Sequence, residues 1–445
     1  MWKLHLLIET NTEILPSHKR GIDMLDFIFD RRNFLRIGSI GAGMSAIGLS
    51  DIGLAAKSAQ EGFDAYKDKT VVWVWLGGGP TQFETFHAPL DDVPSEWKPV
   101  NGNIYDSKTN ISLGADWQEL SKHTTKLNVV NSFSHKDSSH RQGTHFMMTG
   151  HYNSERSTTS TAKYPSFGSI VSSLYGANNP NNGVPTYVKQ GKIEGDEGAW
   201  LGGAYKPFDP SNKDNLTPRI ELDRFSTRKQ LLAGLDAASV SGKGAESVQF
   251  YKGQAYDVIL GSAKNAFAVE KESDATKALY GSTKANDIGE QLILARRLAE
   301  NGTRFITLHY GGWDMHSNIS KAMKGKVPPL DKALAGFLQD LQDRGLSDKV
   351  LLVVTGEFGR TKFNTNSGRD HWPSITPMLM AGGEYQSGRT IGVADRSYSP
   401  IENPVGPLDL QATLFNHFGI DENIQKTDNG GRPRYLLEGE AKVIL

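Results

Sequence analysis

Apolar, strand-like stretches in this chain run directly into glycine and then into acidic residues or histidine. The pattern occurs in VVWVWLGGGPTQFETF, RFITLHYGGWDMH and LLVVTGEFGR, and the acid and histidine of GRDHW follow a little later. In open α/β sheets, ligands bind outside the carboxyl ends of the strands, because the loops there vary while the strands hold them in place. The metal-binding residue types of the chain therefore gather where such a fold places its site.

Segments with strand and helix patterns alternate along the chain. Strands are expected at 70–76, 127–133, 184–189, 304–310, 349–355 and 377–381, and helices at 116–126, 141–148, 166–175, 254–270, 287–301, 330–344 and 408–418. The alternation predicts an α/β fold with right-handed crossovers and a mostly parallel sheet covered by helices on both faces. We interpret residues 191–250, which are rich in Gly, Asp, Lys and Ser, as an insertion or cap.

Charge and cysteine content exclude several classes of function. The 445 residues carry a formal net charge of −1, which leaves no basic footprint for DNA or RNA. The chain has no cysteine, so disulfides, thiolate metal sites and a cysteine nucleophile are all excluded.

The N-terminal region predicts export. Asp30-Arg31-Arg32-Asn33-Phe34-Leu35-Arg36 fills every position of a twin-arginine signal and precedes a run rich in Gly, Ala, Ser and Ile. Serines and Asp51 interrupt this run well short of the ~20 apolar residues of a stable membrane span. We therefore interpret residues 1–56 as an export signal for the twin-arginine translocation machinery, with 1–23 as a candidate start-site artefact before Met24. Residues 57–445 are the mature domain, expected in the periplasm or outside the cell.

Asp314 and His316 follow the strand at 304–310 within the motif GGWDMH. In extended backbone, residues two apart point the same way, so both side chains can reach one ion or one substrate. The alternative is a loop in which Asp314 caps a turn and His316 is merely exposed. Two glycines directly after a strand favour the site, because they allow something to approach the backbone closely.

Two further segments combine acids, bases and histidine. Glu357 stands just beyond an apolar strand with Arg360 three residues later, which suits a cation and an oxyanion, or alternatively a structural salt bridge. In the segment RDHW, Arg369 precedes Asp370 and His371. Adjacent side chains diverge, so we expect His371 to face the site and Asp370 to support it from behind.

The segment SHKDSSHRQGTHFMMTGHY is rich in histidine, and its expected helix places Ser138, Ser139 and His140 near a helix N-terminus, a natural anion site. The alternative is a solvated histidine-rich loop. Near the first strand, Glu84 in GGGPTQFETFH is a candidate ligand or a turn residue. A mixed set of carboxylates and imidazoles suits a divalent Zn, Mn or Fe ion, and a metal-activated oxygen would attack a phosphorus, sulfur or acyl centre.

Taken together, the motifs resemble the exported proteins of the domain of unknown function 1501 family, a sulfatase-like group related to the alkaline phosphatase superfamily. The resemblance covers nearly everything after the signal and includes HRQGTHFMMTGHY, HYGGWDMHSN, TGEFGRTKFN, GRDHW and DLQATLFNHFGID. It implies a three-layer α/β/α sandwich with a metal-centred site at the strand ends. By position, the residues that resemble the superfamily's metal-binding set are Asp314, His316, Glu357 and His371, with Glu84 as a weaker addition.

Two departures from the resemblance limit the mechanism. Superfamily phosphatases usually space one Asp and His four apart, whereas Asp314 and His316 are two apart, and Glu357-Phe358 stands where an Asp-His pair is usual. Typical sulfatases need a Cys or Ser followed by x-Pro/Ala-x-Arg for a formylglycine. Neither Ser138 nor Ser139 has arginine four residues on, so a conventional sulfatase mechanism is not expected.

We therefore expect an exported metal-dependent hydrolase of phosphate or sulfate esters, acting on a small-molecule or polysaccharide ester. Ser139 or Thr144 is the expected nucleophile, unless a metal-bound water takes that role, and the expected supporting catalytic residues are His140, Arg360 and Arg369. The alternative is a non-catalytic exported protein that binds a polysaccharide or an anion in a cleft lined by Trp313 and Trp372.

Overall fold

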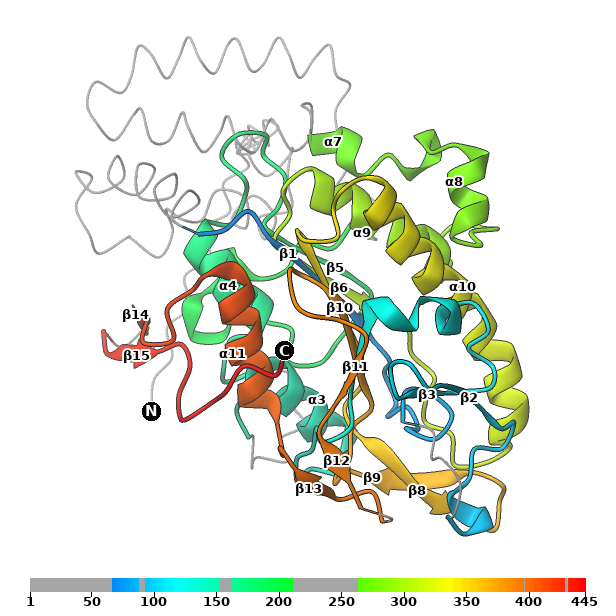
Figure 1. Ribbon diagram of the computed structural model, residues 1–445. Helices are drawn as coiled ribbons and strands as arrows, with labels where there is room; N and C mark the ends of the chain where they lie inside the picture. The colour runs from blue at the N-terminus through cyan, green and yellow to red at the C-terminus, as the bar shows by residue number, and fades with distance from the viewer. Residues whose placement is uncertain (1–65, 88–92, 153–161, 211–262, 396, 429–430) are drawn as a thin grey trace, which may run out of the picture.

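A seven-stranded sheet forms the centre of the structure, a computed structural model that describes residues 66–87, 93–152, 162–210, 263–395, 397–428 and 431–445 (Figure 1). Across the sheet, the strands are β11 (Arg389–Ile391), β4 (Leu127–Val130), β10 (Met378–Gly382), β7 (Val350–Thr355), β1 (Thr70–Trp75), β6 (Phe305–His309) and β5 (Tyr187–Gln190). The predicted export signal and most of the predicted cap, from residue 211 onward, lie outside the described residues.

The sheet is mostly parallel, as the alternation of strands and helices predicts. β5, β6, β1 and β7 pair in parallel, and only β10 runs the other way, antiparallel to both β7 and β4. β11 pairs in parallel with β4. All six residues of β1, TVVWVW, are buried, because helices cover both faces of the sheet and a central strand has no polar side.

Two helical layers enclose the sheet and confirm the predicted α/β/α sandwich (Figure 1). On one face, α9 (Ile288–Glu300) and α10 (Ile319–Asp343) pack with β-strand residues such as Val72 and Leu352 into one apolar core. On the other face, α4 (Phe167–Tyr175) and α11 (Pro407–Phe418) form a second core with Trp73 and Met380. The end of α3 (His140–Thr149) joins that second core.

Three helix predictions differ from the structure. The segment 116–126 forms a 3-10 helix only over η4 (Leu120–Lys126), and His123 inside it is not helical. The helix predicted at 330–344 begins at Ile319 instead, because Ile319, Met323 and Val327 are fully buried and hold the segment before Pro328 and Pro329 against the core. Of the helix predicted at 254–270, the described part contains only α7 (Ala263–Ala266) and the 3-10 helix η8 (Val269–Lys271).

Two-stranded hairpins lie outside the central sheet. They are β2 (Asn103–Asp106) with β3 (Ile111–Gly114), β8 (Gly359–Phe363) with β9 (Arg369–Trp372), β12 (Val393–Ala394) with β13 (Pro400–Glu402), and β14 (Gln425–Thr427) with β15 (Pro433–Tyr435). The β8–β9 and β12–β13 hairpins lie at the same end of the molecule as α3, at the bottom of Figure 1. None of the described helices combines the length and the apolar character that a membrane span requires.

Candidate functional site

The carboxyl ends of β1, β6 and β7 meet the start of α3 and the β8–β9 hairpin. Three glycines follow β1, and Gly78 has φ +115°, which favours glycine. A Cβ at Gly78 would lie 2.5 Å from the backbone nitrogen of Asp314, so only glycine lets the loop after β1 pass this close to the loop after β6. The strand ends therefore converge on one small region, as the sequence predicts.

Three imidazoles surround the Asp314 carboxylate in this region. Its Oδ1 lies 2.9 Å from Nε2 of His316 and 3.3 Å from Nε2 of His371. Its Oδ2 lies 3.3 Å from Nε2 of His140. The two Nε2 atoms of His316 and His371 are 3.1 Å apart. These four residues, which come from α3, the loop after β6 and β9, are called the rim cluster below.

The other ring nitrogen of each histidine contacts an oxygen acceptor. Nδ1 of His140 lies 2.6 Å from Oε1 of Glu357, and Nδ1 of His371 lies 2.7 Å from the carbonyl oxygen of Ser138. Nδ1 of His316 lies 2.8 Å from Oδ1 of Asp370. An oxygen acceptor at Nδ1 places the proton of a neutral imidazole there, which leaves the lone pair of Nε2 in His140 and His371 directed toward Asp314. Nε2 of His316 faces both Asp314 and Nη1 of Arg360, the latter at 3.4 Å.

With neutral imidazoles, the rim cluster thus brings three nitrogen lone pairs close to a carboxylate, an arrangement that a proton or a cation between them would stabilise. The ligand atoms of His140, Asp314 and His371 all lie within 4.8 Å of one another. In a tetrahedral zinc site with bonds of about 2.0–2.1 Å, ligand atoms are roughly 3.3 Å apart, close to the separations seen here. Nitrogen and carboxylate donors suit Zn, Mn or Fe, so the cluster fits the cofactor that the sequence predicts.

Glu357 belongs to this region but lies behind the cluster. Its side chain is only 2% exposed, and the backbone N–H of Gly78 donates to Oε1 at 2.9 Å and to Oε2 at 3.1 Å. The hydrogen bond from His140 to Glu357 raises the pKa of His140, although burial opposes this shift. Glu357 is therefore better placed to orient His140 than to bind a metal, and Nε2 of His140, predicted as a catalytic group, is the ring atom that lies near Asp314.

Arg360 faces inward. Its Nε donates to the carbonyl of Gly79 at 2.8 Å, Nη1 donates to the carbonyl of Arg369 at 3.0 Å, and Nη2 donates to Oδ1 of Asp314 at 2.6 Å. Nη2 also donates to the carbonyl of Gly78. Nη1 also lies 3.4 Å from Nε2 of His316, so these contacts engage all five guanidinium N–H groups, and the side chain is 1% exposed. The prediction that Arg360 clamps a substrate oxyanion is therefore corrected: it holds Asp314.

Arg360 keeps the Asp314 carboxyl group ionised. Burial alone would raise the pKa of Asp314, but the hydrogen bond and positive charge of Arg360 outweigh it and lower the pKa to about 2. Asp314 is consequently a carboxylate at any ordinary pH, while 45% of its side chain stays exposed.

Glu84 and Arg369 form a separate buried pair. This placement corrects the prediction of Glu84 as a metal ligand and of Arg369 as a supporting catalytic residue. Arg369 Nη2 donates to Oε1 of Glu84 at 2.9 Å, and the two side chains are 0% and 2% exposed. The guanidinium lies 4.0 Å from the ring centres of both Phe83 and Phe363, and the backbone N–H of Val100 donates to Glu84 at 3.2 Å. These contacts hold both charges inside the protein, so Glu84 is not placed as a metal ligand and Arg369 is not placed as a substrate contact.

The two predicted nucleophiles lie on α3. Ser139 is the exposed N-cap residue; its hydroxyl bonds Gln142, and its backbone N–H donates to Oδ1 of Asp137 at 2.9 Å. Thr144 is buried inside the helix. Among the described residues, no histidine of the rim cluster hydrogen-bonds either hydroxyl, so nothing in the structure activates them and their role stays a prediction.

Comparison with known families agrees with the sequence motifs. Residues 68–445 match the family described as "Protein of unknown function (DUF1501)". The chain belongs to this family. The predicted membership is thereby confirmed, and the match spans all of the described elements.

Solved structures similar to this DUF1501 chain include a synthase, a sulfatase and an alkaline phosphatase, each of low identity. The lipoteichoic acid synthase LtaP from Listeria monocytogenes is 13% identical over 84% of this chain and 78% of that chain, with a TM-score of 0.37. The PsFucS1 sulfatase from Pseudoalteromonas sp. is 10% identical over 87% and 77%, with a TM-score of 0.38. Alkaline phosphatase from the Antarctic bacterium TAB5 is 11% identical over 79% and 98%, with a TM-score of 0.36. TM-scores this low establish neither a shared activity nor a shared site. Curated protein sequences gave no match.

The tryptophans proposed to line a binding cleft are differently placed. Trp313 is 1% exposed and donates its ring N–H to the carbonyl of Tyr310 at 2.9 Å, so it is a core residue of the DUF1501 fold and not a cleft wall. Trp372 is partly buried against Phe83, Ile375 and Tyr398. The binding-protein alternative therefore loses one of its two predicted aromatic surfaces.

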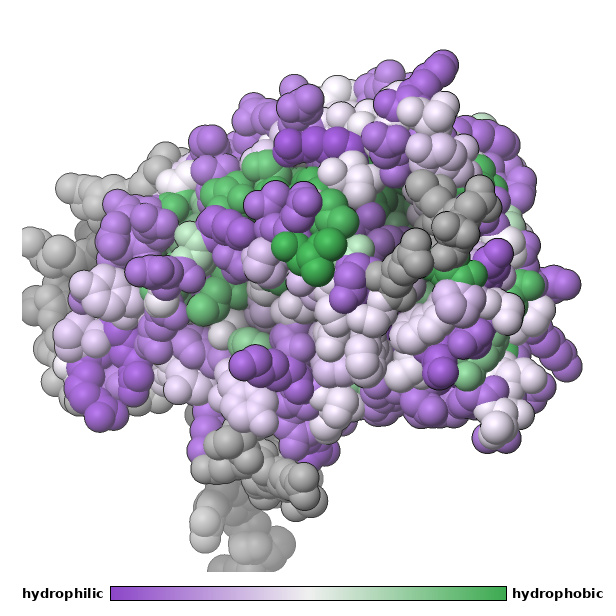
Figure 2. All heavy atoms as spheres, turned by 60° about the horizontal axis from the view of Figure 1, so that its bottom comes forward, coloured by the Kyte–Doolittle hydropathy of each residue, from purple (hydrophilic) through white to green (hydrophobic). Residues whose placement is uncertain are grey.

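Figure 2 shows the end of the molecule that carries α3 and the β8–β9 hairpin, and most of this face is hydrophilic with apolar patches between. Exposed apolar side chains at this end include Val393 and Ile401 of the β12–β13 hairpin.

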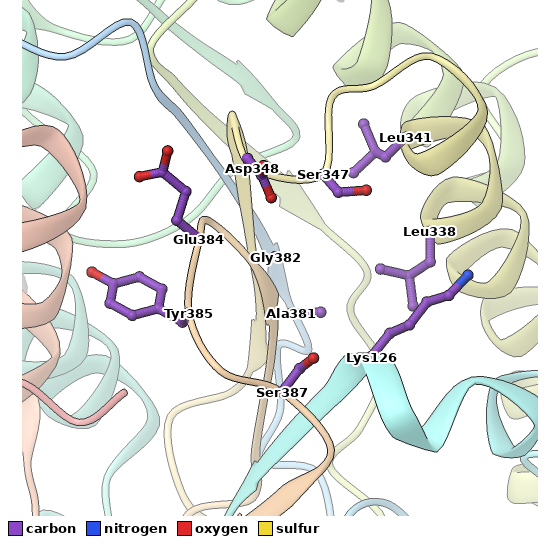
Figure 3. A pocket seen from close by; sticks show the side chains of 10 residues that line it. All are labelled: Lys126, Leu338, Leu341, Ser347, Asp348, Ala381, Gly382, Glu384, Tyr385 and Ser387. Atoms are coloured by element: carbon purple, nitrogen blue, oxygen red, sulfur yellow. The ribbon is translucent and has the colours of Figure 1, made fainter.

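A cavity of about 250 Å³ lies elsewhere (Figure 3). Ser347 and Asp348, which precede β7, and Gly382, which ends the antiparallel β10, line it, so it opens at the opposite rim of the sheet. Its Glu384 pairs with Lys69 at 2.8 Å. The cavity does not include any residue of the rim cluster.

Proposed function

We propose that the protein is an exported, metal-dependent hydrolase of phosphate or sulfate esters that works without formylglycine. The observation that carries the proposal is the convergence of three imidazole Nε2 atoms on the Asp314 carboxylate at the carboxyl rim of the sheet. When bound there, a divalent Zn, Mn or Fe ion would polarise an ester oxygen and lower the pKa of a water molecule.

The residues of the chain have distinct roles in this proposal. The residues that would hold the ion are His140, Asp314, His316 and His371. Glu357 and Asp370 accept the Nδ1 protons of His140 and His316 and thereby keep both rings turned toward Asp314. Arg360 keeps Asp314 ionised and in place.

Phosphorus or sulfur esters are favoured because a metal-activated oxygen suits attack at these centres and because the motifs resemble a sulfatase-like family. The absence of cysteine and the missing arginine after Ser138 and Ser139 support a mechanism without formylglycine. A small-molecule and a polysaccharide ester both remain within the proposal.

Export through the twin-arginine translocation machinery is part of the same proposal, with the periplasm or the exterior as destination. It is supported by the sequence around Arg31 and Arg32, which lies outside the described residues. A reporter protein fused to residues 1–56 should be exported, and replacing both arginines by lysine should retain it in the cytoplasm. Export that is unchanged by this replacement would contradict the assignment.

The decisive experiment for the catalytic proposal combines elemental analysis with activity. Purified residues 57–445 are treated with a chelator, reloaded with Zn, Mn or Fe, and assayed on aryl phosphate and aryl sulfate esters. We expect stoichiometric uptake of one of these metals, hydrolysis that depends on it, and loss of both in His371→Gln. His123→Gln, at a half-buried histidine outside the cluster, is the matched control. A folded chain that takes up no transition metal would remove the proposal, and glycan binding unaffected by Asp314→Ala would favour the binding-protein alternative.

A further inference from the structure

His309, the last residue of β6, is a half-buried histidine outside the rim cluster. Within the part of the chain that the structure describes, no hydrogen bond engages its ring. Burial lowers the pKa of His309, and the nearby charges of Glu357 and Lys326 act on it in opposite directions. The ring is therefore neutral near pH 7 and carries one N–H donor and one lone pair.

Three glycines, each following a different strand, pack closely against this side chain. A Cβ at Gly77, after β1, would lie 2.4 Å from Nε2 of His309, and a Cβ at Gly311, after β6, would lie 2.9 Å from the same atom. A Cβ at Gly191, after β5, would lie 2.8 Å from the Cβ of His309. Any other residue at these positions would force the imidazole to move, so the three segments together form a fitted seat for it.

The seat adjoins the rim cluster. Gly77 touches His309, while the next residue, Gly78, donates to Glu357 and passes within contact distance of the Asp314 backbone. With 3.8 Å between consecutive Cα atoms, the ring of His309 and the backbone nitrogen of Asp314 are at most about 12 Å apart. Both groups therefore lie at the same carboxyl rim of the sheet, where His309 ends β6 and Asp314 follows it.

The arginines predicted to hold the oxyanion do not serve it. Arg360 donates to Asp314 and to backbone carbonyls, and Arg369 donates to Glu84 and to backbone carbonyls. The proposed substrate therefore needs a donor other than these two guanidinium groups, and an unengaged imidazole beside the cluster is such a donor.

We propose that His309 is a substrate-binding residue whose ring N–H donates a hydrogen bond to an oxygen of a tetrahedral oxyanion bound at the rim cluster. This inference rests on the proposed function, because it takes the anion to be the phosphate or sulfate group of the substrate. It gives a role to a side chain that begins the motif HYGGWDMHSN and lies outside the rim cluster.

The test titrates purified residues 57–445 with inorganic phosphate by calorimetry, both with and without zinc. His309→Ala should weaken phosphate binding about 2- to 10-fold, the effect of losing one hydrogen bond, while zinc uptake stays normal. His309→Gln, which keeps an N–H donor, should lose less. Gly311→Ala keeps His309 in the sequence but pushes its ring aside, and should also weaken phosphate binding. His123→Gln, at a half-buried histidine whose pKa burial also lowers, should have no effect.

Equal phosphate affinity in the wild type and His309→Ala would overturn the inference, as would a wild-type chain that binds no phosphate with or without zinc. These outcomes differ from a failure of the proposed function, which would show as absent metal uptake or absent hydrolysis. A chain that takes up no zinc is still compared with its variants in the metal-free titration, so the role of His309 is decided in either case.

Discussion

Two carboxylate–guanidinium pairs in this protein have similar geometry and different surroundings. Asp314 and Arg360 lie 2.6 Å apart at the rim, with 45% of the Asp314 side chain exposed. Glu84 and Arg369 lie 2.9 Å apart in the interior, where both side chains are at most 2% exposed. Distance therefore does not distinguish them. Asp314 keeps an open side that three imidazoles face, whereas every side of the Glu84–Arg369 pair is closed by protein.

The interior pair should dominate stability. Glu84→Gln leaves the Arg369 guanidinium buried without its counter-charge, which typically costs about 3–5 kcal/mol. We expect the free energy of unfolding in urea to fall by that amount. Glu119→Gln, which breaks an exposed pair with Lys122 of the same 2.9 Å length, should cost less than about 1 kcal/mol. Equal losses in the two variants would show that burial does not set the difference.

The rim pair should dominate metal binding instead. Residues that merely support a ligand cost about 10–100-fold in metal affinity when changed, so replacing the ligand Asp314 by Asn should lower zinc affinity at least about 100-fold. Buried Arg360 loses its carboxylate partner in this variant, but the cost in unfolding should be smaller than that of Glu84→Gln, because 45% of the Asp314 side chain is exposed to water. Competition with a chromophoric chelator measures this. Asp343→Asn, at an exposed acid on α10, is the control. Unchanged affinity in Asp314→Asn would contradict the rim cluster as a metal centre.

Interior histidine should make stability depend on pH. His417 is 2% exposed, and burial lowers its pKa to about 4, with Lys69 and Glu384 as the neighbouring charges. Because the unfolded chain takes up this proton near pH 6.5 and the folded chain does not, the stabilisation is complete above pH 6.5 and falls as the pH drops toward 4. At pH 5 the loss from this residue is about 2 kcal/mol.

Comparing urea unfolding at pH 8 and pH 5 in the wild type and His417→Gln isolates this contribution, because other histidines titrate in both chains. The variant should lose about 2 kcal/mol less than the wild type on acidification. A difference between the two chains that does not change with pH would argue against the buried, neutral state of His417.

The smallest effect is expected just behind the rim. Asp370→Asn removes the carboxylate that accepts from Nδ1 of His316 at 2.8 Å, and should lower zinc affinity about 10-fold. The same chelator competition measures it, and the free energy of unfolding should stay within about 0.5 kcal/mol, since Asp370 is exposed. If Asp370→Asn weakened zinc as strongly as Asp314→Asn, the two residues would have to share the ligand role.

Much of the fold follows from local pattern. The strands predicted at 70–76, 304–310 and 349–355 are found at Thr70–Trp75, Phe305–His309 and Val350–Thr355, because continuous apolar runs between polar or glycine-rich stretches suit strands buried on both faces. The helix predicted at 116–126 was wrong because tertiary contacts override the periodicity of this segment. The Asp331 carboxylate accepts hydrogen bonds from the backbone N–H groups of Glu119 and Leu120 at 2.7 Å each.

The sequence alone determined that Asp314 and His316 would stand at the carboxyl rim of a parallel sheet, since strand ends and glycines are local features. His371 reaches the same place from β9 of a separate hairpin. Only the tertiary structure decided what each charged group faces. Glu84 pairs with Arg369 across 285 residues of chain, and His140 turns toward Asp314 because Glu357, 217 residues away, accepts its other proton. Side-chain directions of this kind depend on which segments meet in space, and neither composition nor spacing within one segment contains that information.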